Sequence, residues 1–186
     1  TPMTTIGGFV DGILDGTISQ KEQTHYLEIV SQEGKRLSRL VVSMLSLSKL
    51  EAGEMKIKPA PTKLTNTLFN VLLGFEKRIE EHDLQILGMD EMESVTVMAD
   101  PDLLHQVVYN LVENAIKYTP QGGYIRMQVS REDGRITLTI RNSGKGIPKK
   151  DLPHVFERFY KADKSRGTDK SGSGLGLYLV KTIISL

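Results

Sequence analysis

Two amide side chains and one ammonium group share a stripe of a predicted helix. Asn110, Asn114 and Lys117 recur at helical spacing, and a rotation of about 100° per residue places them within about 60° of one another around the helix axis. Amide oxygens are suitable ligands for a hard cation such as Mg²⁺, and a nearby lysine can bind the phosphate that the same cation holds. The stripe therefore predicts a metal and phosphate site, although the solvated edge of an ordinary helix has the same composition.

Two glycine-rich segments could bring the backbone close to a flat ring or a phosphate. Residues 142–147 (Asn-Ser-Gly-Lys-Gly-Ile) follow a predicted strand directly, and glycine lacks the Cβ that would keep a ligand away. Residues 172–177 (Gly-Ser-Gly-Leu-Gly-Leu) open a predicted helix, whose free N–H groups and positive dipole end can bind an anion. Taken singly, each segment would also suit an ordinary turn.

The sequence between these two segments combines aromatic and basic side chains. Residues 156–160 (Phe-Glu-Arg-Phe-Tyr) contain three aromatic residues, which indicate either a hydrophobic anchor for a mobile lid or a small satellite core. Residues 144–174 contain eight basic and four acidic side chains. This local excess of positive charge suits a polyphosphate, and it would also be compatible with a solvated loop.

Composition narrows the classes of protein and partner. The chain has 186 residues, of which 24 are Lys or Arg and 23 are Asp or Glu, so its formal net charge is +1. This balance gives no electrostatic reason to expect nucleic acid as a partner. Cysteine is absent, which excludes disulfides, thiolate zinc sites and cysteine nucleophiles. No apolar run reaches the ~20 residues that a membrane-spanning helix needs, so we expect no direct membrane contact.

The first part of the chain predicts a helical hairpin. Apolar residues at three-and-four spacing mark a helix over residues 3–14, and Ser19 with Glu22 has the spacing of a capping box at the start of a longer helix. The apolar seam of this second helix consists of Val30, Leu37, Leu40, Met44 and Leu47. Two helices cannot cover this seam, so we expect residues 3–52 to form a homodimer, a dimeric four-helix bundle. Alternatively, the hairpin packs on the remainder of its own chain.

After Gly53 the pattern changes to alternating strands and helices. We expect strands over residues 55–58, 84–88, 94–98, 123–130 and 135–141, and helices over residues 64–79, 101–118 and 175–186. The helix over residues 101–118 is the clearest, because Asp100 can cap it and Pro101 suits its first position. Glu132-Asp133-Gly134 predicts a hairpin turn between the last two strands.

Four segments in this order resemble the motifs of sensor histidine kinases. They are the N box (residues 110–119), the first glycine box (142–147), the F box (156–160) and the second glycine box (172–177). The hairpin over residues 3–52 resembles the dimerisation and phosphotransfer domain of that family. Its opening Thr1-Pro2 resembles the end of the H box, His-Glu-Leu-Arg-Thr-Pro, so the resemblance extends over essentially the whole chain.

The resemblance implies an α+β fold and two domains. Residues 1–54 would form the helical hairpin of the dimeric four-helix bundle, and residues 55–186 a Bergerat-type α/β sandwich that binds ATP with Mg²⁺. The implied activity is that of a protein-histidine kinase, which transfers the γ-phosphoryl group of ATP to a histidine and then to an aspartate of a response regulator. The implied location is the cytoplasm, with a bacterial membrane-anchored sensor as the parent protein.

The resemblance also implies roles for individual residues. Asn114 would coordinate Mg²⁺, while Asn110 and Lys117 would contact phosphate oxygens. Tyr118 would line the ribose and adenine side of the site, and Asn142 stands where the family has an aspartate that accepts a hydrogen bond from the adenine amino group. Glycines of both boxes would lie against the nucleotide: Gly144 and Gly146 beneath it, and Gly172, Gly174 and Gly176 with backbone N–H groups toward the phosphates.

The chain departs from the family pattern at four places. The phosphoacceptor histidine should lie four residues before Thr1, so we expect this chain alone not to phosphorylate itself. The family usually continues beyond the last helix with further strands, so one sheet edge would be incomplete. Lys161 stands where an arginine often reaches the γ-phosphate, and lysine keeps the charge but lacks the bidentate geometry. Asn142 replaces the aspartate. Thr1 itself would orient a water for dephosphorylation of the response regulator.

Two other functions remain open at this point. A degenerate kinase would dimerise and dock a response regulator as a scaffold without transferring phosphate. A conformational ATPase related to the gyrase and chaperone families would hydrolyse ATP. Those ATPases carry a glutamate four residues before the metal-binding asparagine, where this chain has Asn110, and an amide cannot take a proton as a carboxylate does. The sequence therefore favours a kinase.

Overall fold

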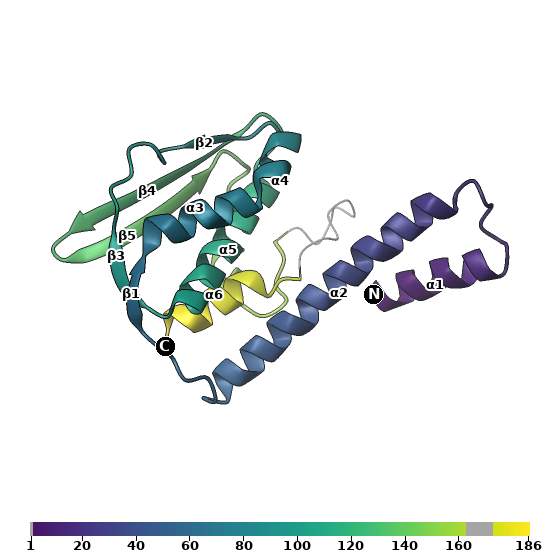
Figure 1. Cartoon of the computed structure of the whole chain (residues 1–186), viewed down its shortest axis with the longest axis horizontal. Helices are drawn as coiled ribbons and strands as arrows, with labels where there is room; N and C mark the ends of the chain where they lie inside the picture. Colours follow the sequence, from purple (N-terminus) through teal and green to yellow (C-terminus); the bar gives the residue numbers. More distant parts are fainter. Residues whose placement is uncertain (1, 163–172) are drawn as a thin grey trace.

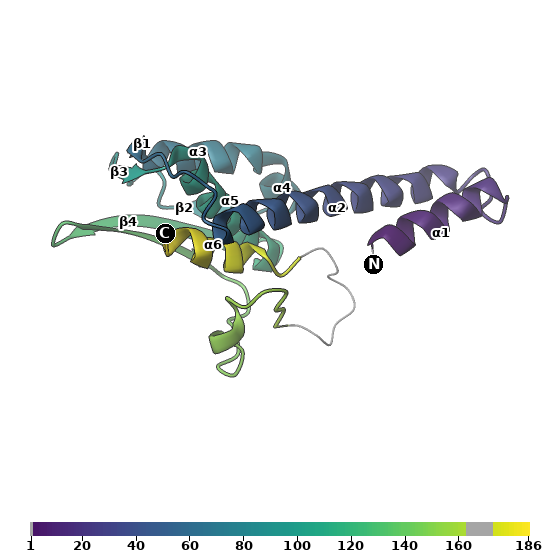
Figure 2. The same ribbon diagram turned by 90° about the horizontal axis from the view of Figure 1, so that it is seen from below.

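A helical hairpin and an α/β domain follow one another in the computed structural model, which describes residues 2–162 and 173–186 (Figure 1). Helix α1 (Pro2–Leu14) and helix α2 (Gln23–Glu51) form the hairpin, as predicted. The view from below shows α2 reaching the helices of the α/β domain with its last turns, while α1 lies beside the far half of α2 (Figure 2). None of the described helices combines the length and the hydropathy that a membrane span requires.

The predicted capping box at the start of α2 is wrong. The Ser19 hydroxyl donates a 2.6 Å hydrogen bond to the Glu22 carboxylate, and Glu22 precedes α2 without any side-chain hydrogen bond to the first turn. The two side chains have the predicted spacing, but they satisfy each other. Among the described contacts, neither side chain accepts from the N–H groups that a capping box would cover.

The α/β domain contains a two-stranded and a three-stranded sheet among the described residues. Strand β1 (Ala60–Lys63) pairs antiparallel with β3 (Thr96–Ala99). In the other sheet, β4 (Tyr124–Glu132) lies between β2 (Gln85–Leu87), to which it is parallel, and β5 (Arg135–Asn142), to which it is antiparallel. The helices are α3 (Leu64–Gly74), α4 (Glu76–Glu81), α5 (Pro101–Tyr118) and α6 (Gly176–Ile184). This mixed sheet with helices confirms the α+β class.

Two predicted elements differ from the structure. The strand expected over residues 55–58 lies at residues 60–63 instead, because the N–H of Lys58 donates to the Asp100 carboxylate at 2.9 Å and pairing with β3 begins only at Ala60. Pro61 is tolerated there because β1 is an edge strand. The helix expected over residues 64–79 is divided into α3 and α4 at Phe75, whose side chain is buried in the core.

The remaining local predictions are confirmed. Asp100 caps α5 by accepting hydrogen bonds from the N–H groups of Asp102 and Leu103. The N–H of Lys58 also donates to this carboxylate. These hydrogen bonds lower the pKa of Asp100, and the one from Lys58 has the largest effect. Asp133 and Gly134 both adopt positive φ, at 50° and 76°, which a two-residue turn between right-twisted strands requires.

The core forms around α5, which packs against the sheet and α3 on one side. Its Val108, Val112 and Ile116 are almost fully buried together with Leu68 of α3. Strand β4 contributes Ile125 and Met127, which are inaccessible to solvent. The opposite edge of α5 carries its polar stripe, so burial of the apolar face fixes the direction in which the amides point.

A second cluster joins the hairpin to the α/β domain. Leu47 and Leu50 of α2 are buried against Leu103 and Val107 of α5 and three residues of α6. Elsewhere in α2, five large apolar side chains are about half exposed: Leu27, Val41, Val42, Met44 and Leu45. Of the predicted seam this set includes only Met44, whereas Leu47 packs on the same chain. Packing on the same chain, the alternative to a dimer, thus accounts only for the last turns of α2.

Candidate functional site

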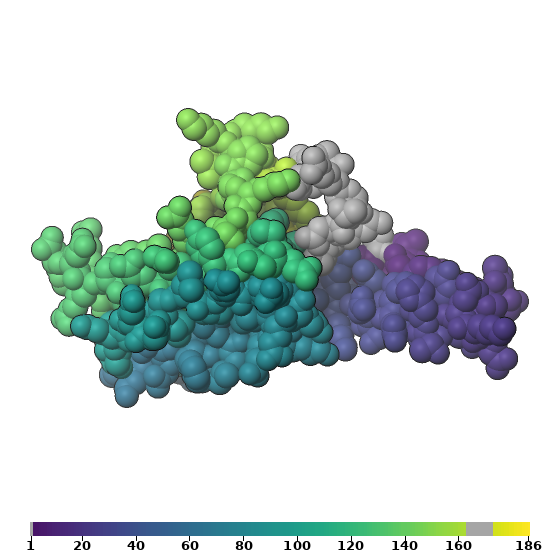
Figure 3. Space-filling model, turned by 90° about the horizontal axis from the view of Figure 1, so that it is seen from above, coloured from purple at the N-terminus to yellow at the C-terminus, as the bar shows by residue number. Residues whose placement is uncertain are grey.

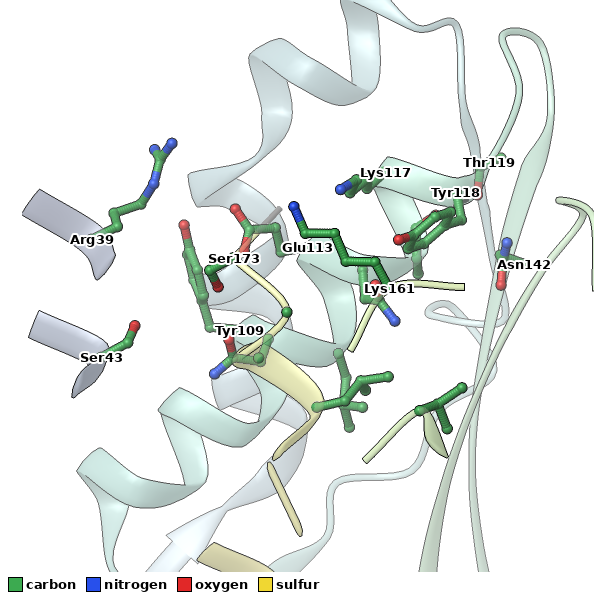
Figure 4. A pocket seen from close by; sticks show the side chains of 18 of the residues that line it. Arg39, Ser43, Tyr109, Glu113, Lys117, Tyr118, Thr119, Asn142, Lys161 and Ser173 are labelled. Carbon is green, nitrogen blue, oxygen red and sulfur yellow. Dashed lines mark hydrogen bonds between the residues drawn. The ribbon is translucent and has the colours of Figure 1, made fainter. Parts of the chain in front are cut away.

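A groove of about 2070 Å³ lies between α2 and the α/β domain. Arg39 and Ser43 enter it from α2, whereas Tyr109, Glu113, Lys117 and Tyr118 enter from α5 (Figure 4). The segment after β5 stands out from the body of the molecule beside the groove (Figure 3). The described site residues predicted from the sequence all line it: Asn110, Asn114, Lys117, Tyr118, Asn142, Gly144, Gly146, Lys161, Gly174 and Gly176. Thr1 and Gly172 lie outside the described residues.

The amide of Asn110 has a defined orientation. Its Nδ2 donates a 2.7 Å hydrogen bond to the backbone oxygen of Gln106, one turn earlier on α5. The carbonyl end faces the first turn of α6, because a Cβ at Gly176 would lie 3.0 Å from Asn110 Oδ1. This close approach brings an amide acceptor and the N-terminal end of α6 to the same wall of the groove.

The side chains of the groove could bind a metal ion only together with an anionic ligand that supplies most of the coordination. Among the described residues, no group of three or more His, Cys, Asp or Glu side chains could hold a metal ion. The side-chain oxygen that lies against the first turn of α6 is the amide oxygen of Asn110, and amide oxygens suit a hard cation but give it no charge compensation. A Mg²⁺ ion here would therefore need an anionic partner such as a phosphate chain, and Asn114 lines the groove where it could contribute one oxygen.

The other end of the groove is built by the first glycine box at the end of β5. A Cβ at Gly144 would overlap the backbone oxygen of Tyr118 and lie 2.7 Å from Asn142 Nδ2. Gly146 differs, because a Cβ there would meet nothing within 4 Å. The structure thus requires glycine at residue 144 for packing, and it leaves the position of Gly146 open toward a ligand.

Tyr118 offers a flat surface beside this turn. Its side chain is half exposed, and the Lys117 ammonium lies 5.3 Å from its ring centroid. Such an aromatic face next to Asn142 suits a stacked or edge-on heteroaromatic ring. The amide of Asn142 could accept from or donate to the polar edge of that ring.

Four consecutive residues of the F box each contact a different partner. The Glu157 carboxylate lies 2.7 Å from His154 Nδ1, and the Arg158 guanidinium is paired with Glu51 at the end of α2. The Phe159 N–H donates to the Gly174 oxygen at 3.0 Å. The Tyr160 hydroxyl donates to the Asp151 carboxylate at 2.7 Å, and this hydrogen bond, more than burial, raises the pKa of Tyr160.

The satellite core considered for the F box is not formed among the described residues. Phe156 is 43% exposed and Phe159 is 57% exposed, so their rings are not buried against each other. Phe159 also has a φ of 60°, an uncommon value for a bulky residue. Polar contacts and the crossing with Gly174 therefore hold this segment.

Sequence reasoning missed the contribution of α2 to the groove. Arg36, Arg39 and Ser43 line it from the side opposite the amides. Their spacing places them on one face of α2, which was the only available signal. Tyr109 was also missed: burial raises its pKa, and the nearby Glu113 carboxylate adds to this effect, opposed by the charge of Arg39.

Two family descriptions match the chain. The description "His Kinase A (phospho-acceptor) domain" matches residues 1–53, and "Histidine kinase-, DNA gyrase B-, and HSP90-like ATPase" matches residues 99–186. The sensor histidine kinase WalK of Bacillus subtilis (strain 168) is 30% identical over 187 residues, which cover 99% of this chain and 30% of WalK. The chain thus spans about a third of the length of the curated relatives that it matches.

Solved structures of histidine kinases share the fold. The chain matches AdeS of Acinetobacter baumannii with a TM-score of 0.80 and 26% identity, over 100% of this chain and 84% of AdeS. It also matches the histidine kinase ThkA, solved in complex with the response regulator protein TrrA, with a TM-score of 0.69 and 25% identity. That match covers 87% of this chain and 47% of the ThkA chain.

The contrast between Gly144 and Gly146 gives a direct test of the turn after β5. Gly144→Ala should lower the free energy of unfolding by about 1–3 kcal/mol, because the methyl group overlaps the Tyr118 backbone. Gly146→Ala should leave the free energy of unfolding within ~0.5 kcal/mol of the parent. Chemical denaturation of both variants measures the difference. Equal stability of the two would show that the backbone of Tyr118 does not lie against residue 144.

Proposed function

We propose that this chain, which belongs to the sensor histidine kinases, binds Mg²⁺–ATP in the groove and supplies its γ-phosphoryl group to a histidine. One observation carries the proposal: the amide stripe of α5, the first glycine box, the described part of the second and Lys161 line one groove whose opposite wall is α2 of the hairpin. A nucleotide bound there would lie between the ATP-binding elements and the helices of the phosphotransfer hairpin.

The residues divide along the groove according to the parts of ATP. Asn142 and Tyr118 would contact the adenine end, and Asn110, Lys117 and Lys161 the phosphates. Asn114 would provide the protein ligand to Mg²⁺, which when bound neutralises charge on the phosphate chain. The first turn of α6 would add backbone N–H donors and the positive end of its dipole.

The histidines of the chain do not lie where the phosphoacceptor belongs. His25 is in α2, His82 follows α4, His105 is in α5 and His154 pairs with Glu157. His25 lies within the residues that the phospho-acceptor domain matches, but it is followed by Tyr-Leu-Glu and not by the Glu-Leu-Arg-Thr-Pro of an H box. We therefore place the acceptor upstream of Thr1, in a longer protein in which the present chain is the cytoplasmic part of a membrane-anchored sensor.

We assign the two functional units to residues 1–54 and 55–186. Gly53, with a φ of 66°, ends the hairpin just before this boundary. The half-exposed apolar side chains of α2 support a homodimer through residues 3–52. A receiver domain of a response regulator is the proposed partner, as a complex of this kind has been solved for ThkA with TrrA.

The metal-binding role of Asn114 can be tested by nucleotide titration. Asn114→Ala should weaken Mg²⁺–ATP binding by at least about tenfold, because the cation loses its only proposed protein ligand. Titration calorimetry with and without Mg²⁺ measures the effect, and the benefit of Mg²⁺ should be lost in the variant. An unchanged affinity would refute the assignment. Absence of nucleotide binding in the parent chain would instead favour the degenerate kinase.

Asn142 should weaken base discrimination. A carboxylate accepts only, whereas an amide can accept from adenine or donate to guanine. A hydrogen bond to a charged carboxylate contributes about 1.5–3 kcal/mol, whereas one to a neutral amide contributes about 0.5–1.5 kcal/mol. The difference corresponds to roughly tenfold weaker ATP binding with asparagine than with aspartate. Asn142→Asp should therefore tighten ATP binding and widen the preference for ATP over GTP. If competition titrations show both affinities unchanged, the side chain does not face the base.

The dimer can be tested by light scattering at high micromolar concentration. Leu40→Asp should convert a dimer into a monomer, because it places a charge in the apolar seam of α2. Ser31→Asp, at an exposed position of the same helix, is the matched control and should remain dimeric. A parent chain that is monomeric at this concentration would contradict the proposal.

A further inference from the structure

One carboxylate at the end of α2 joins three elements that are far apart in the sequence. Glu51 pairs with the Arg158 guanidinium of the F box, and it accepts a 2.9 Å hydrogen bond from the Tyr178 hydroxyl of α6. Arg158 also lies over the Tyr178 ring, 4.9 Å from its centroid. Each member of this triad therefore contacts both of the others.

The position of Glu51 is unfavourable for α2 by itself. It is the last residue of the helix, where the negative end of the helix dipole disfavours a carboxylate. Leu47 and Leu50, in the same turn, are buried against α5 and α6. Apolar packing thus already holds the turn, and the carboxylate adds a contact to Arg158 of the F box.

Beginning at Tyr160, residues of the groove closely follow Arg158 in the sequence. The next residue, Phe159, donates its N–H to the Gly174 oxygen at 3.0 Å, and Lys161 follows two residues later. Gly174 adopts a φ of 75° at this crossing, where a Cβ would lie 2.7 Å from the Phe159 backbone. A shift of Arg158 would therefore move the phosphate end of the groove, whereas Asn142 on β5 belongs to a separate element.

We infer that Glu51 is a positioning residue for nucleotide binding: through Arg158 it holds Lys161 and Gly174 in the arrangement that receives the outer phosphates of ATP. This inference rests on the proposed function and adds to it a residue of the hairpin. The packing of α2 and the affinity for ATP are then energetically coupled, and a change in either must act on the other to the same extent.

The expected effect is modest because both charged side chains are partly exposed. Arg158 is 46% exposed and Glu51 is 34% exposed, and exposed ion pairs contribute little. The hydroxyl of Tyr178 and the ring beneath the guanidinium strengthen the pair. We expect loss of the contact to weaken Mg²⁺–ATP binding about three- to fivefold.

The test is a double-mutant cycle measured by titration with Mg²⁺–ATP and with AMP. Glu51→Gln and Arg158→Gln should each weaken Mg²⁺–ATP binding about three- to fivefold, and the double variant should be no weaker than either single variant. AMP lacks the outer phosphates, so its affinity should change less than about twofold. Arg158→Lys, which keeps the charge, should recover part of the affinity for ATP. Glu81→Gln, which breaks the exposed pair with Lys77 on α4, is the matched control.

Four outcomes would overturn the inference. Additive losses in the double variant would show that the two side chains act separately. Equal losses for ATP and AMP, or a lower melting temperature with unchanged ATP affinity, would reduce the triad to a structural contact. A parent chain that binds neither nucleotide would refute the proposed function itself, and the inference with it.

Discussion

Helix α5 must bury one face and keep the opposite edge polar, and the rest of the molecule depends on this constraint. Its apolar face packs against the sheet and α3, and a neighbouring arc packs against α2 and α6. The amide stripe lies on the remaining edge, where Asn110 and Asn114 are partly exposed toward the groove. Asp100 fixes the start of this helix and also holds the linker from the hairpin through the N–H of Lys58. One carboxylate therefore sets both the beginning of the site helix and the path of the chain that enters the domain.

The elements that local rules determine could be predicted from the sequence. The cap at Asp100, the spacing of apolar residues in α5 and the positive-φ turn at Asp133 act over a few residues, and each appears in the structure. One local rule failed, because the Ser19 and Glu22 side chains bond to each other and do not cap α2. The other errors arose at residues with contacts far away in the sequence. Lys58 donates its N–H to Asp100, which lies 42 residues away, and α3 ends at Phe75, whose ring lies 4.9 Å from that of Tyr109 in α5.

The groove illustrates the same division. Residues that share a motif, such as the amides of α5 or the glycines after β5, could be identified because they lie within a few residues of one another in the sequence. The contribution of α2 could not, because nothing local indicates that Arg39 and Ser43 face the domain. The contact between Glu51 and Arg158 spans 107 residues and joins two segments that belong to different motifs. Such pairs depend on how the domains dock, which no periodicity encodes.

The buried cluster of Leu47 and Leu50 limits how freely the two parts of such a protein can be exchanged. A hybrid that joined the hairpin of one relative to the ATP-binding domain of another at Gly53 would carry the last turn of α2 from the wrong parent. That turn packs against α5 and α6, so the hybrid would inherit a mismatched apolar surface and a mismatched partner for Arg158. A junction one or two turns earlier in α2, N-terminal to Leu47, would keep the whole docking surface from one source. The best junction for a hybrid protein therefore lies within α2 and not at the linker that follows it.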